Sequence, residues 1–196
     1  MSMGSGLEEL GIIDDSEDAA DNGRIPPHAD RRAREPSPND PTAPLQRLLR
    51  QITLFEGLLP VHLRRIAALA QEVRCKRGDA VFKHGDEGDG LYLILEGAVR
   101  ISRTVSGMGE EALAILQPGM YFGEMSIVDD DSPRSADAIA HEETRMLKLP
   151  KDDLRDLMFV DRELAYELLW RFIRTLSGRL RESNDRLLML TVSSRF

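Results

Sequence analysis

The stretch "AVFKHGDEGDGLYLILEGAVRIS", residues 80–102, decides the fold class. It holds three short apolar runs, at residues 80–82, 91–95 and 98–101, which are separated by "HGDEGDG" and "EG". Short runs of this kind, bounded by glycine-rich turns, predict antiparallel β-strands. Glycines at the corners suit a sheet that bends closely back on itself.

Further strands are expected on the C-terminal side of this stretch. "EALAILQPG" ends in a Pro-Gly turn, and "SADAIA" and "TRMLKLP" follow it before Pro150. About seven or eight short strands between Cys75 and Pro150 predict an antiparallel roll or barrel, similar to a jelly roll, and not a parallel α/β sheet.

Helical patterns flank the predicted strands, so the fold class is predicted to be α+β. Residues after Thr42, the expected N-cap, carry apolar side chains at helical spacing, and "LPVHLRRIAALAQEV", residues 59–73, repeats the pattern. His62 in this second helix is expected to be exposed. "KDDLRDLMFV" predicts a short helix after Pro150, since Asp152 and Asp153 suit a helix N-terminus.

A long helix is predicted from about Arg162 to Leu190. Its apolar residues fall on a seam with a seven-residue repeat, namely Leu169, Ile173, Leu176, Leu180, Leu187 and Leu190, with Ser183 in the gap. A 3.5-residue period over about three heptads is typical of a helix that pairs with a copy of itself. The alternative is a helix that packs on its own domain and carries the period by accident.

The composition excludes several classes of protein. Hydrophobic residues make up 41% of the 196 residues, which is enough for a core. The single cysteine, Cys75, excludes an internal disulfide and a cysteine-based zinc site, and it favours a reducing, cytoplasmic setting. No apolar run approaches the roughly 20 residues of a membrane span, and the N-terminus lacks a secretory signal.

Residues 1–41 are predicted to be a disordered leader. They hold ten acidic residues and four arginines, a net charge of −6, and residues 25–44 contain six prolines. The short patch "LEELGII" could alternatively be a docking motif. The remaining 155 residues hold 24 acids and 22 bases, so no basic surplus predicts nucleic-acid binding.

The segment "FGEMSIVDDDSPRSA", residues 122–136, carries the chemistry. Gly123 lets backbone amides approach a ligand, and a short helical turn at Glu124–Ser126 would present free N–H groups to an anion. Arg134 and Ser135 suit a phosphate, while the Glu124 carboxylate suits a hydroxyl. Together they predict a pocket for a sugar fused to a phosphate. Alternatively, Glu124 and Arg134 pair with each other in a domain without a ligand.

This segment resembles the phosphate-binding cassette of the cyclic nucleotide-binding domain family, in which Phe-Gly-Glu and a small residue precede a variable loop and Pro-Arg-small-Ala. "KRGDAVFKHGDEGDGLYLILEGAVRI" resembles the first strands of that family, and the likeness extends over about residues 54–190. It implies that Gly123 and Glu124 bind the ribose 2′-hydroxyl. It also implies that the Ser126 amide, Arg134 and Ser135 hold the cyclic phosphate, and that Ser183 and Asn184 contact the base.

The predicted ligand site therefore comprises Gly123, Glu124, Met125, Ser126, Arg134, Ser135, Ser183 and Asn184. The expected ligand is cAMP, with cGMP as the alternative, and we expect no catalytic residue, metal site or other cofactor. The Asp129–Asp131 run is expected to be a solvated loop. The predicted domains are a leader at 1–41, a β-roll with flanking helices at 42–160, a dimerisation helix at 161–190 and a tail at 191–196.

The sequence predicts a bacterial, stand-alone cyclic nucleotide sensor that forms a homodimer and signals through an unidentified protein partner. No helix-turn-helix follows the long helix, so direct DNA binding is not expected. The alternatives are a ligand-free dimeric scaffold of the same fold and a DNA-binding regulator of unusual form.

Overall fold

The structure is a computed structural model that describes residues 40–105, 107, 109–129 and 131–193. These residues lie in the second of the two units into which the chain divides, Ala33–Phe196. The predicted leader lies outside the described residues apart from Asp40 and Pro41, and so do the last three residues of the predicted tail.

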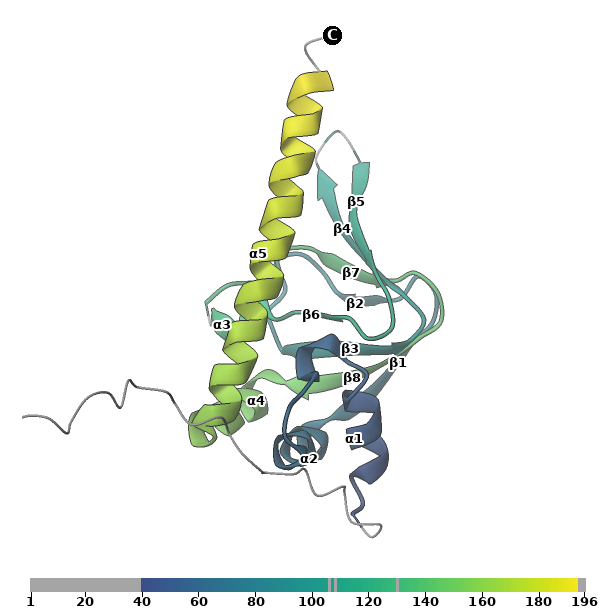
Figure 1. Ribbon diagram of the computed structural model, residues 1–196. Helices are drawn as coiled ribbons and strands as arrows, with labels where there is room; N and C mark the ends of the chain where they lie inside the picture. Colours follow the sequence, from purple (N-terminus) through teal and green to yellow (C-terminus); the bar gives the residue numbers. More distant parts are fainter. Residues whose placement is uncertain (1–39, 106, 108, 130, 194–196) are drawn as a thin grey trace, which may run out of the picture. The chain divides into compact units, whose positions relative to one another are not determined.

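The described strands form two antiparallel four-stranded sheets (Figure 1). The first has the order β1-β8-β3-β6, built from β1 (Gln71–Cys75), β8 (Thr144–Pro150), β3 (Gly90–Glu96) and β6 (Tyr121–Phe122). The second has the order β2-β7-β4-β5, built from β2 (Ala80–Phe82), β7 (Asp137–Ala140), β4 (Val99–Val105) and β5 (Gly109–Leu116). The prediction of an α+β fold with an antiparallel β-roll is confirmed.

Strand β3 separates two hydrophobic cores because its side chains alternate between two buried faces. Leu91 and Leu93 pack toward the helices, whereas Tyr92 and Ile94 pack between the two sheets. Burying each such side chain stabilises the fold by roughly 1.5–3 kcal/mol, so β3 fixes both layers at once.

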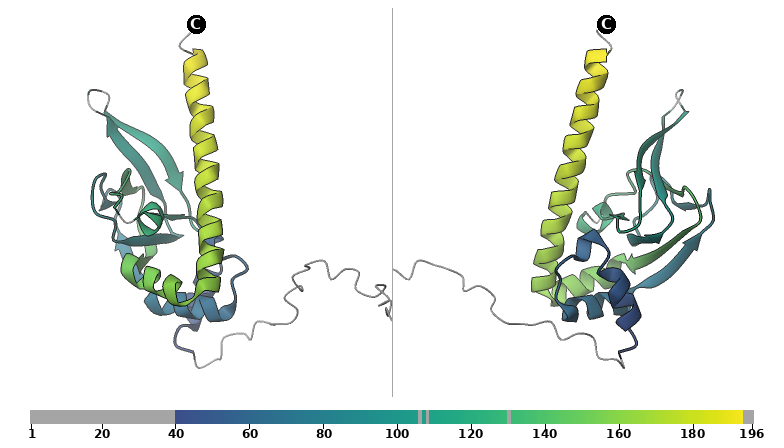
Figure 2. Two further views of the ribbon diagram at one scale, coloured as in Figure 1. Left: turned by 90° about the vertical axis from the view of Figure 1, so that its left-hand side faces the viewer. Right: turned by 45° about the vertical axis from the view of Figure 1, so that its right-hand side comes forward.

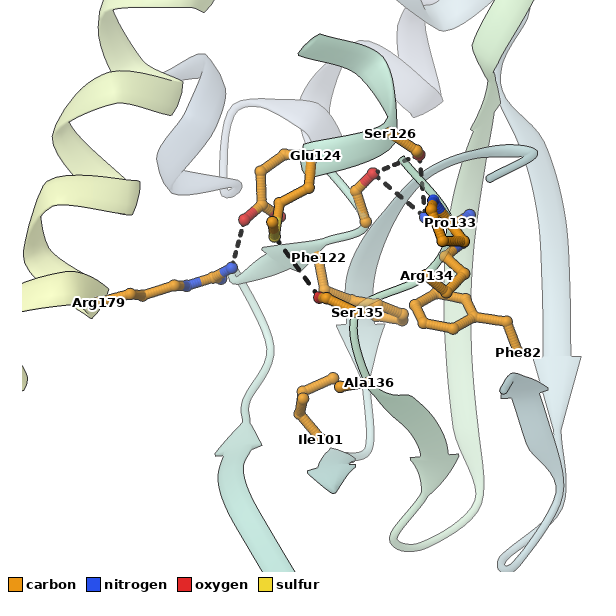
Figure 3. A pocket seen from close by; sticks show the side chains of 12 residues that line it. Phe82, Ile101, Phe122, Glu124, Ser126, Pro133, Arg134, Ser135, Ala136 and Arg179 are labelled. Carbon is orange, nitrogen blue, oxygen red and sulfur yellow. Dashed lines mark hydrogen bonds and ion pairs between the residues drawn. The ribbon is translucent and has the colours of Figure 1, made fainter. Parts of the chain in front are cut away.

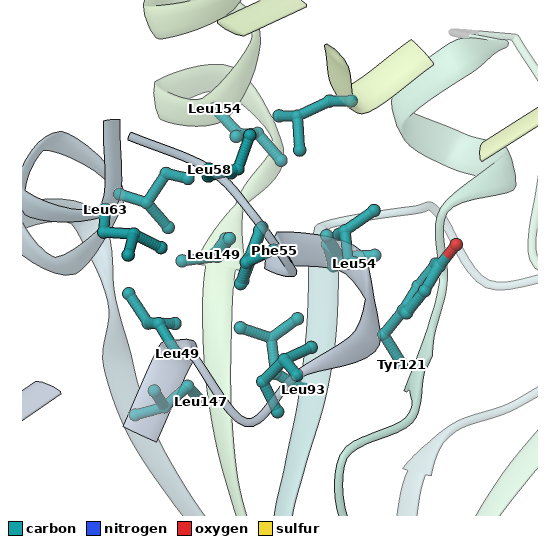
Figure 4. Close-up of a cluster of buried hydrophobic side chains, with 14 of the residues drawn as sticks. Leu49, Leu54, Phe55, Leu58, Leu63, Leu93, Tyr121, Leu147, Leu149 and Leu154 are labelled. Atoms are coloured by element: carbon teal, nitrogen blue, oxygen red, sulfur yellow. The ribbon is translucent and has the colours of Figure 1, made fainter. Parts of the chain in front are cut away.

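Five described helices pack on the face of the first sheet that carries Leu91 and Leu93: α1 (Ala43–Leu49), the 3₁₀ turn η1 (Thr53–Phe55), α2 (Pro60–Leu69), α4 (Lys151–Val160) and α5 (Arg162–Ser193). Figure 4 shows how their leucines meet Phe55 and the side chains of β3 and β8 in one cluster. A sixth, α3 (Met125–Val128), is a single turn after β6. Helix α5 runs beside the roll and extends past strands β4 and β5 (Figure 1; Figure 2).

Two expectations for the second helix are wrong. The helix ends at Leu69, and residues 71–75 form β1, which pairs with β8 from Gln71↔Lys148 to Cys75↔Thr144. Val73 and Cys75 pack against the core between the sheets, so tertiary pairing overrides the helical spacing. His62 is only 4% exposed, and its imidazole Nε2 lies 3.6 Å from the Asp161 carboxylate at the start of α5.

Candidate functional site

A hollow of about 440 Å³ lies where α3, the loop before β7 and helix α5 meet. Phe82, Ile101 and Phe122 give it apolar walls, and Glu124, Arg134 and Arg179 supply charge (Figure 3). Apolar walls with a few polar groups are the composition typical of small-molecule sites.

The Arg134 side chain is only 4% exposed, and several contacts hold it in place. Its Nη2 donates to Asp89 Oδ1 at 2.7 Å and to the Gly90 carbonyl at 2.9 Å. Its Nη1 donates to the Gly123 carbonyl and to Ser126 Oγ, both at 3.2 Å. The guanidinium carbon also lies 4.0 Å from the centre of the Phe82 ring. Nε is buried, and among the described residues it has no hydrogen-bond partner.

The backbone of Arg134 is fixed by the loop between β2 and β3. The Gly85 N–H donates to the Arg134 carbonyl at 2.9 Å, and the Arg134 N–H donates to the Asp86 carbonyl at 2.8 Å. Pro133 precedes the arginine and restricts the turn. The two hydrogen bonds and Pro133 therefore fix the backbone from which the Arg134 side chain extends into the hollow.

Glu124 is 1% exposed and stands directly before the short helix α3, without a side-chain capping hydrogen bond. Its Oε1 accepts a hydrogen bond from Arg179 Nη1 of α5 at 2.5 Å, and Arg179 Nη2 donates to the Tyr121 carbonyl at 3.0 Å. Glu124 and Arg134 thus have different partners, and the pairing of these two residues considered from the sequence is wrong. A buried carboxylate is stable here because Arg179 compensates its charge.

Gly123 must be glycine for two reasons. Its φ of 85° lies in the left-handed region, and a Cβ at this position would lie 2.6 Å from Arg134 Nη1 and 2.9 Å from the Gly90 carbonyl oxygen. The Arg134 guanidinium can therefore lie against this turn because residue 123 has no side chain.

Six of the eight predicted site residues line the hollow, namely Gly123, Glu124, Met125, Ser126, Arg134 and Ser135. The Ser135 hydroxyl lies 3.5 Å from the Met125 sulfur, and both side chains are exposed. Ser183 and Asn184 are exposed on α5 and do not line the hollow of this single chain. Their contact with a base stays a prediction.

Sequence reasoning missed Arg179 and Asp89. Arg179 follows Phe172 by seven residues and Thr175 by four, which places it on the buried face of α5 and is a signal the sequence does carry. Asp89 precedes β3, and nothing in its sequence position marks it as a partner of Arg134.

The electrostatics around Asp89 favour its charged form. Burial raises the pKa of the Asp89 carboxyl, but hydrogen bonds from Lys148 and Arg134 outweigh this and hold the pKa below its usual value. The Tyr92 hydroxyl donates to the same carboxylate at 3.1 Å. Burial and this negative neighbour raise the pKa of the Tyr92 phenol.

The described part of the chain lacks two further features. No group of three or more histidine, cysteine or acidic side chains is arranged to hold a metal ion there. Likewise, no helix among these residues has the length and apolar character needed to cross a membrane.

Comparison with known proteins gives consistent matches. The cyclic nucleotide-binding domain family matches residues 72–161. The chain is 34% identical over 143 residues to a CRP-like cAMP-activated global transcriptional regulator of Mycobacterium tuberculosis, which covers 73% of this chain. It is 38% identical over 142 residues to the cyclic AMP receptor protein of Thermus thermophilus, which covers 70% of this chain. The chain spans 62% of the length of each relative.

A solved cyclic nucleotide-binding domain from Methylobacillus flagellatus superposes with a TM-score of 0.64 at 31% identity. The match covers 75% of this chain and 82% of that domain.

Proposed function

Because the chain belongs to the cyclic nucleotide-binding domain family, we propose that its hollow binds a cyclic mononucleotide, with cAMP as the expected ligand and cGMP as the alternative. The observation that carries this proposal is the presence of a buried arginine and a buried glutamate, Arg134 and Glu124, in one apolar-walled hollow. The two relatives are by name a transcriptional regulator and a receptor. The proposed role is therefore that of a sensor, with no reaction assigned to the hollow.

The two charged groups match the two polar ends of such a ligand. A cyclic phosphate carries one negative charge, and the Arg134 guanidinium lines the hollow with a buried Nε–H that has no partner among the described residues. Glu124 retains acceptor capacity beside its bond to Arg179 and can accept a hydrogen bond from a ribose hydroxyl. In the same proposal, Gly123 offers its backbone, and the Ser126 amide and Ser135 hydroxyl add donors to the phosphate.

We further propose that the sensor is a homodimer paired through α5. Trp170, Ile173 and Leu180 are exposed on the side of α5 that faces away from its own domain, and two of them belong to the predicted seam. Large apolar side chains in a row on one helix face favour burial against a second helix. A surface reshaped by the ligand would then be read by a protein partner.

The proposed setting is cytoplasmic, which the single cysteine supports. Direct nucleic-acid binding is not part of the proposal, and a gel-shift assay at low salt tests that expectation.

A ligand-free scaffold is the second candidate, and one observation favours it. Both terminal nitrogens of Arg134 are already bonded to groups of its own chain. The two candidates differ in one measurable property, which is binding of a cyclic nucleotide by the purified chain.

Isothermal titration with cAMP and cGMP tests the proposal. We expect saturable binding, and we expect Arg134→Ala to weaken it by about 1.5–3 kcal/mol, the contribution of a charge-assisted hydrogen bond. Arg134→Lys keeps the charge but loses the planar fork, so it should weaken binding less. Arg77→Ala, in the exposed turn after β1, is the control for a lost surface charge and should bind like the unaltered chain.

The result that would reject the ligand is the absence of both heat and a thermal shift at millimolar nucleotide. Equal binding by the unaltered chain and by an Arg134→Ala variant that unfolds at the same temperature would instead reject the role of this residue.

A further inference from the structure

Three side chains from different parts of the chain converge on the Asp89 carboxylate. Arg134 donates to Oδ1 at 2.7 Å, Lys148 Nζ donates to Oδ2 at 2.5 Å, and the Tyr92 hydroxyl contacts both oxygens at 3.1 and 3.2 Å. Asp89 thus has one cation on each oxygen. Only one of the two, Arg134, lines the hollow.

From this arrangement we propose that Lys148 is a positioning residue for anion binding: it neutralises Asp89, so that Arg134 can be shared with the phosphate of the ligand. This inference rests on the proposed function. It assigns Lys148 no direct contact with the nucleotide, since Lys148 lies on β8 outside the lining of the hollow.

The charges explain why a second cation is needed. Arg134 and Asp89 alone form a neutral pair, and a phosphate that approaches a neutral pair gains little from the arginine. With Lys148 bound to the other oxygen, the three groups carry a net charge of +1. The anion then completes the neutralisation, and Asp89 keeps a partner while Arg134 turns part of its fork to the ligand.

The route of the Lys148 side chain depends on Gly90. A Cβ on Gly90 would lie 2.6 Å from the Leu149 carbonyl oxygen and 3.1 Å from Lys148 Cε. The missing side chain therefore leaves room for the lysine to cross from β8 to Asp89. The Gly90 carbonyl also accepts the second bond of Arg134 Nη2, so Gly90 serves both cations.

The side chain of Lys148 is 22% exposed and that of Asp89 is 50% exposed. The effect of Lys148 on the affinity for cAMP is therefore moderate and depends on the salt concentration. We expect Lys148→Gln to weaken cAMP binding about fivefold at low salt, as for a partly exposed charge pair. The loss should shrink as the salt concentration rises, because partly exposed charges are screened.

A double-mutant cycle on the full chain, measured by titration with cAMP, tests the inference. The cycle compares the unaltered chain, Lys148→Gln, Asp89→Asn and the double variant. If Lys148 acts through Asp89, its loss changes the affinity less than about twofold once Asp89 is uncharged. Lys148→Arg should restore most of the affinity, and Lys83→Gln, an exposed lysine on the nearby loop, should leave the affinity unchanged.

Each other outcome has a definite meaning. The same loss in both backgrounds would overturn the inference in favour of direct contact between Lys148 and the ligand. Unchanged affinity of Lys148→Gln at low salt would also overturn it, and the proposed function would stand. Absence of binding by the unaltered chain would overturn both. Melting temperatures of all variants separate these results from a loss of folding.

Discussion

The two halves of helix α5 are stabilised in different ways. In the half before Leu180, Leu164, Leu168 and Phe172 are fully buried, and the Tyr121 hydroxyl donates to Thr175 Oγ1 at 2.7 Å. From residue 181 to residue 189 every described side chain is exposed. Arg186 still reaches the Leu113 carbonyl on β5 at 2.6 Å. One continuous helix is therefore a core element at its start and a surface element at its end.

Around its circumference, α5 also carries two apolar faces, one buried and one exposed. The face buried in its own domain contains Leu164, Leu168 and Phe172, and it continues through Thr175 to Arg179, which contacts Glu124 in the hollow. The predicted seam contains Ile173 and Leu180, which remain exposed. The first face connects the helix to the site, and the second is available to a copy of the chain. The following substitutions separate the two roles.

The largest effect is expected at the buried face. Phe172→Ala should lower the free energy of unfolding by about 3–5 kcal/mol, because it leaves a cavity between α5 and the core and removes the ring contact with Tyr121. Urea denaturation followed by circular dichroism measures the loss. Ile173→Ala, the next residue but exposed, should cost under about 1 kcal/mol at a protein concentration that favours the monomer. If both variants lost the same free energy of unfolding, the two faces of α5 would contribute equally to stability.

A smaller effect is expected where α5 begins. The Asp161 Oδ1 accepts a hydrogen bond from the Leu164 N–H at 3.1 Å, and Oδ2 contacts Arg65 and His62 of α2. Asp161→Ala should lower the free energy of unfolding by about 1–2 kcal/mol, the usual cost of losing a helix N-cap. Asp152→Ala, in the exposed first turn of α4, is the matched control and should cost less. If both substitutions lowered the free energy of unfolding equally, Asp161 would not stabilise the start of α5 more than an exposed acidic residue does.

The contribution of Asp161 should also depend on pH in a defined direction. Burial raises the pKa of its carboxyl, but the Leu164 amide, His62 and Arg65 outweigh this and lower the pKa below the ordinary value of 3.8. A carboxyl with a lowered pKa in the folded state stabilises the fold above pH 3.8, and this stabilisation is lost as the pH falls further. The difference in stability between the unaltered chain and Asp161→Asn should therefore disappear in acid. A difference that grew below pH 3.8 would contradict this sign.

The fold class and most residues that line the hollow could be predicted from the sequence, because they depend on short-range sequence patterns. Gly123 and Arg134 lie in one short segment, so their order along the chain already limits where they can meet. Asp89 and Arg179 were missed because their contacts with Arg134 and Glu124 span 45 and 55 residues, and only tertiary structure brings them together. The helical pattern predicted over residues 59–73 is wrong for residues 71–73 for the same reason, since pairing with β8 decides their state.

The smallest effect on the folded monomer is expected at the exposed seam, where Leu180→Ala should change the free energy of unfolding by under about 0.5 kcal/mol. The same substitution should weaken self-association, because each chain of the proposed dimer would lose a buried leucine. Sedimentation equilibrium measures the association constant, and Arg181→Ala, the exposed neighbour outside the seam, is the control. If Leu180→Ala lowered the stability of the monomer as much as Phe172→Ala, the end of α5 would belong to the core of its own domain. If it left self-association unchanged, the seam would not be the dimer interface, and the heptad period would be an accident of the sequence.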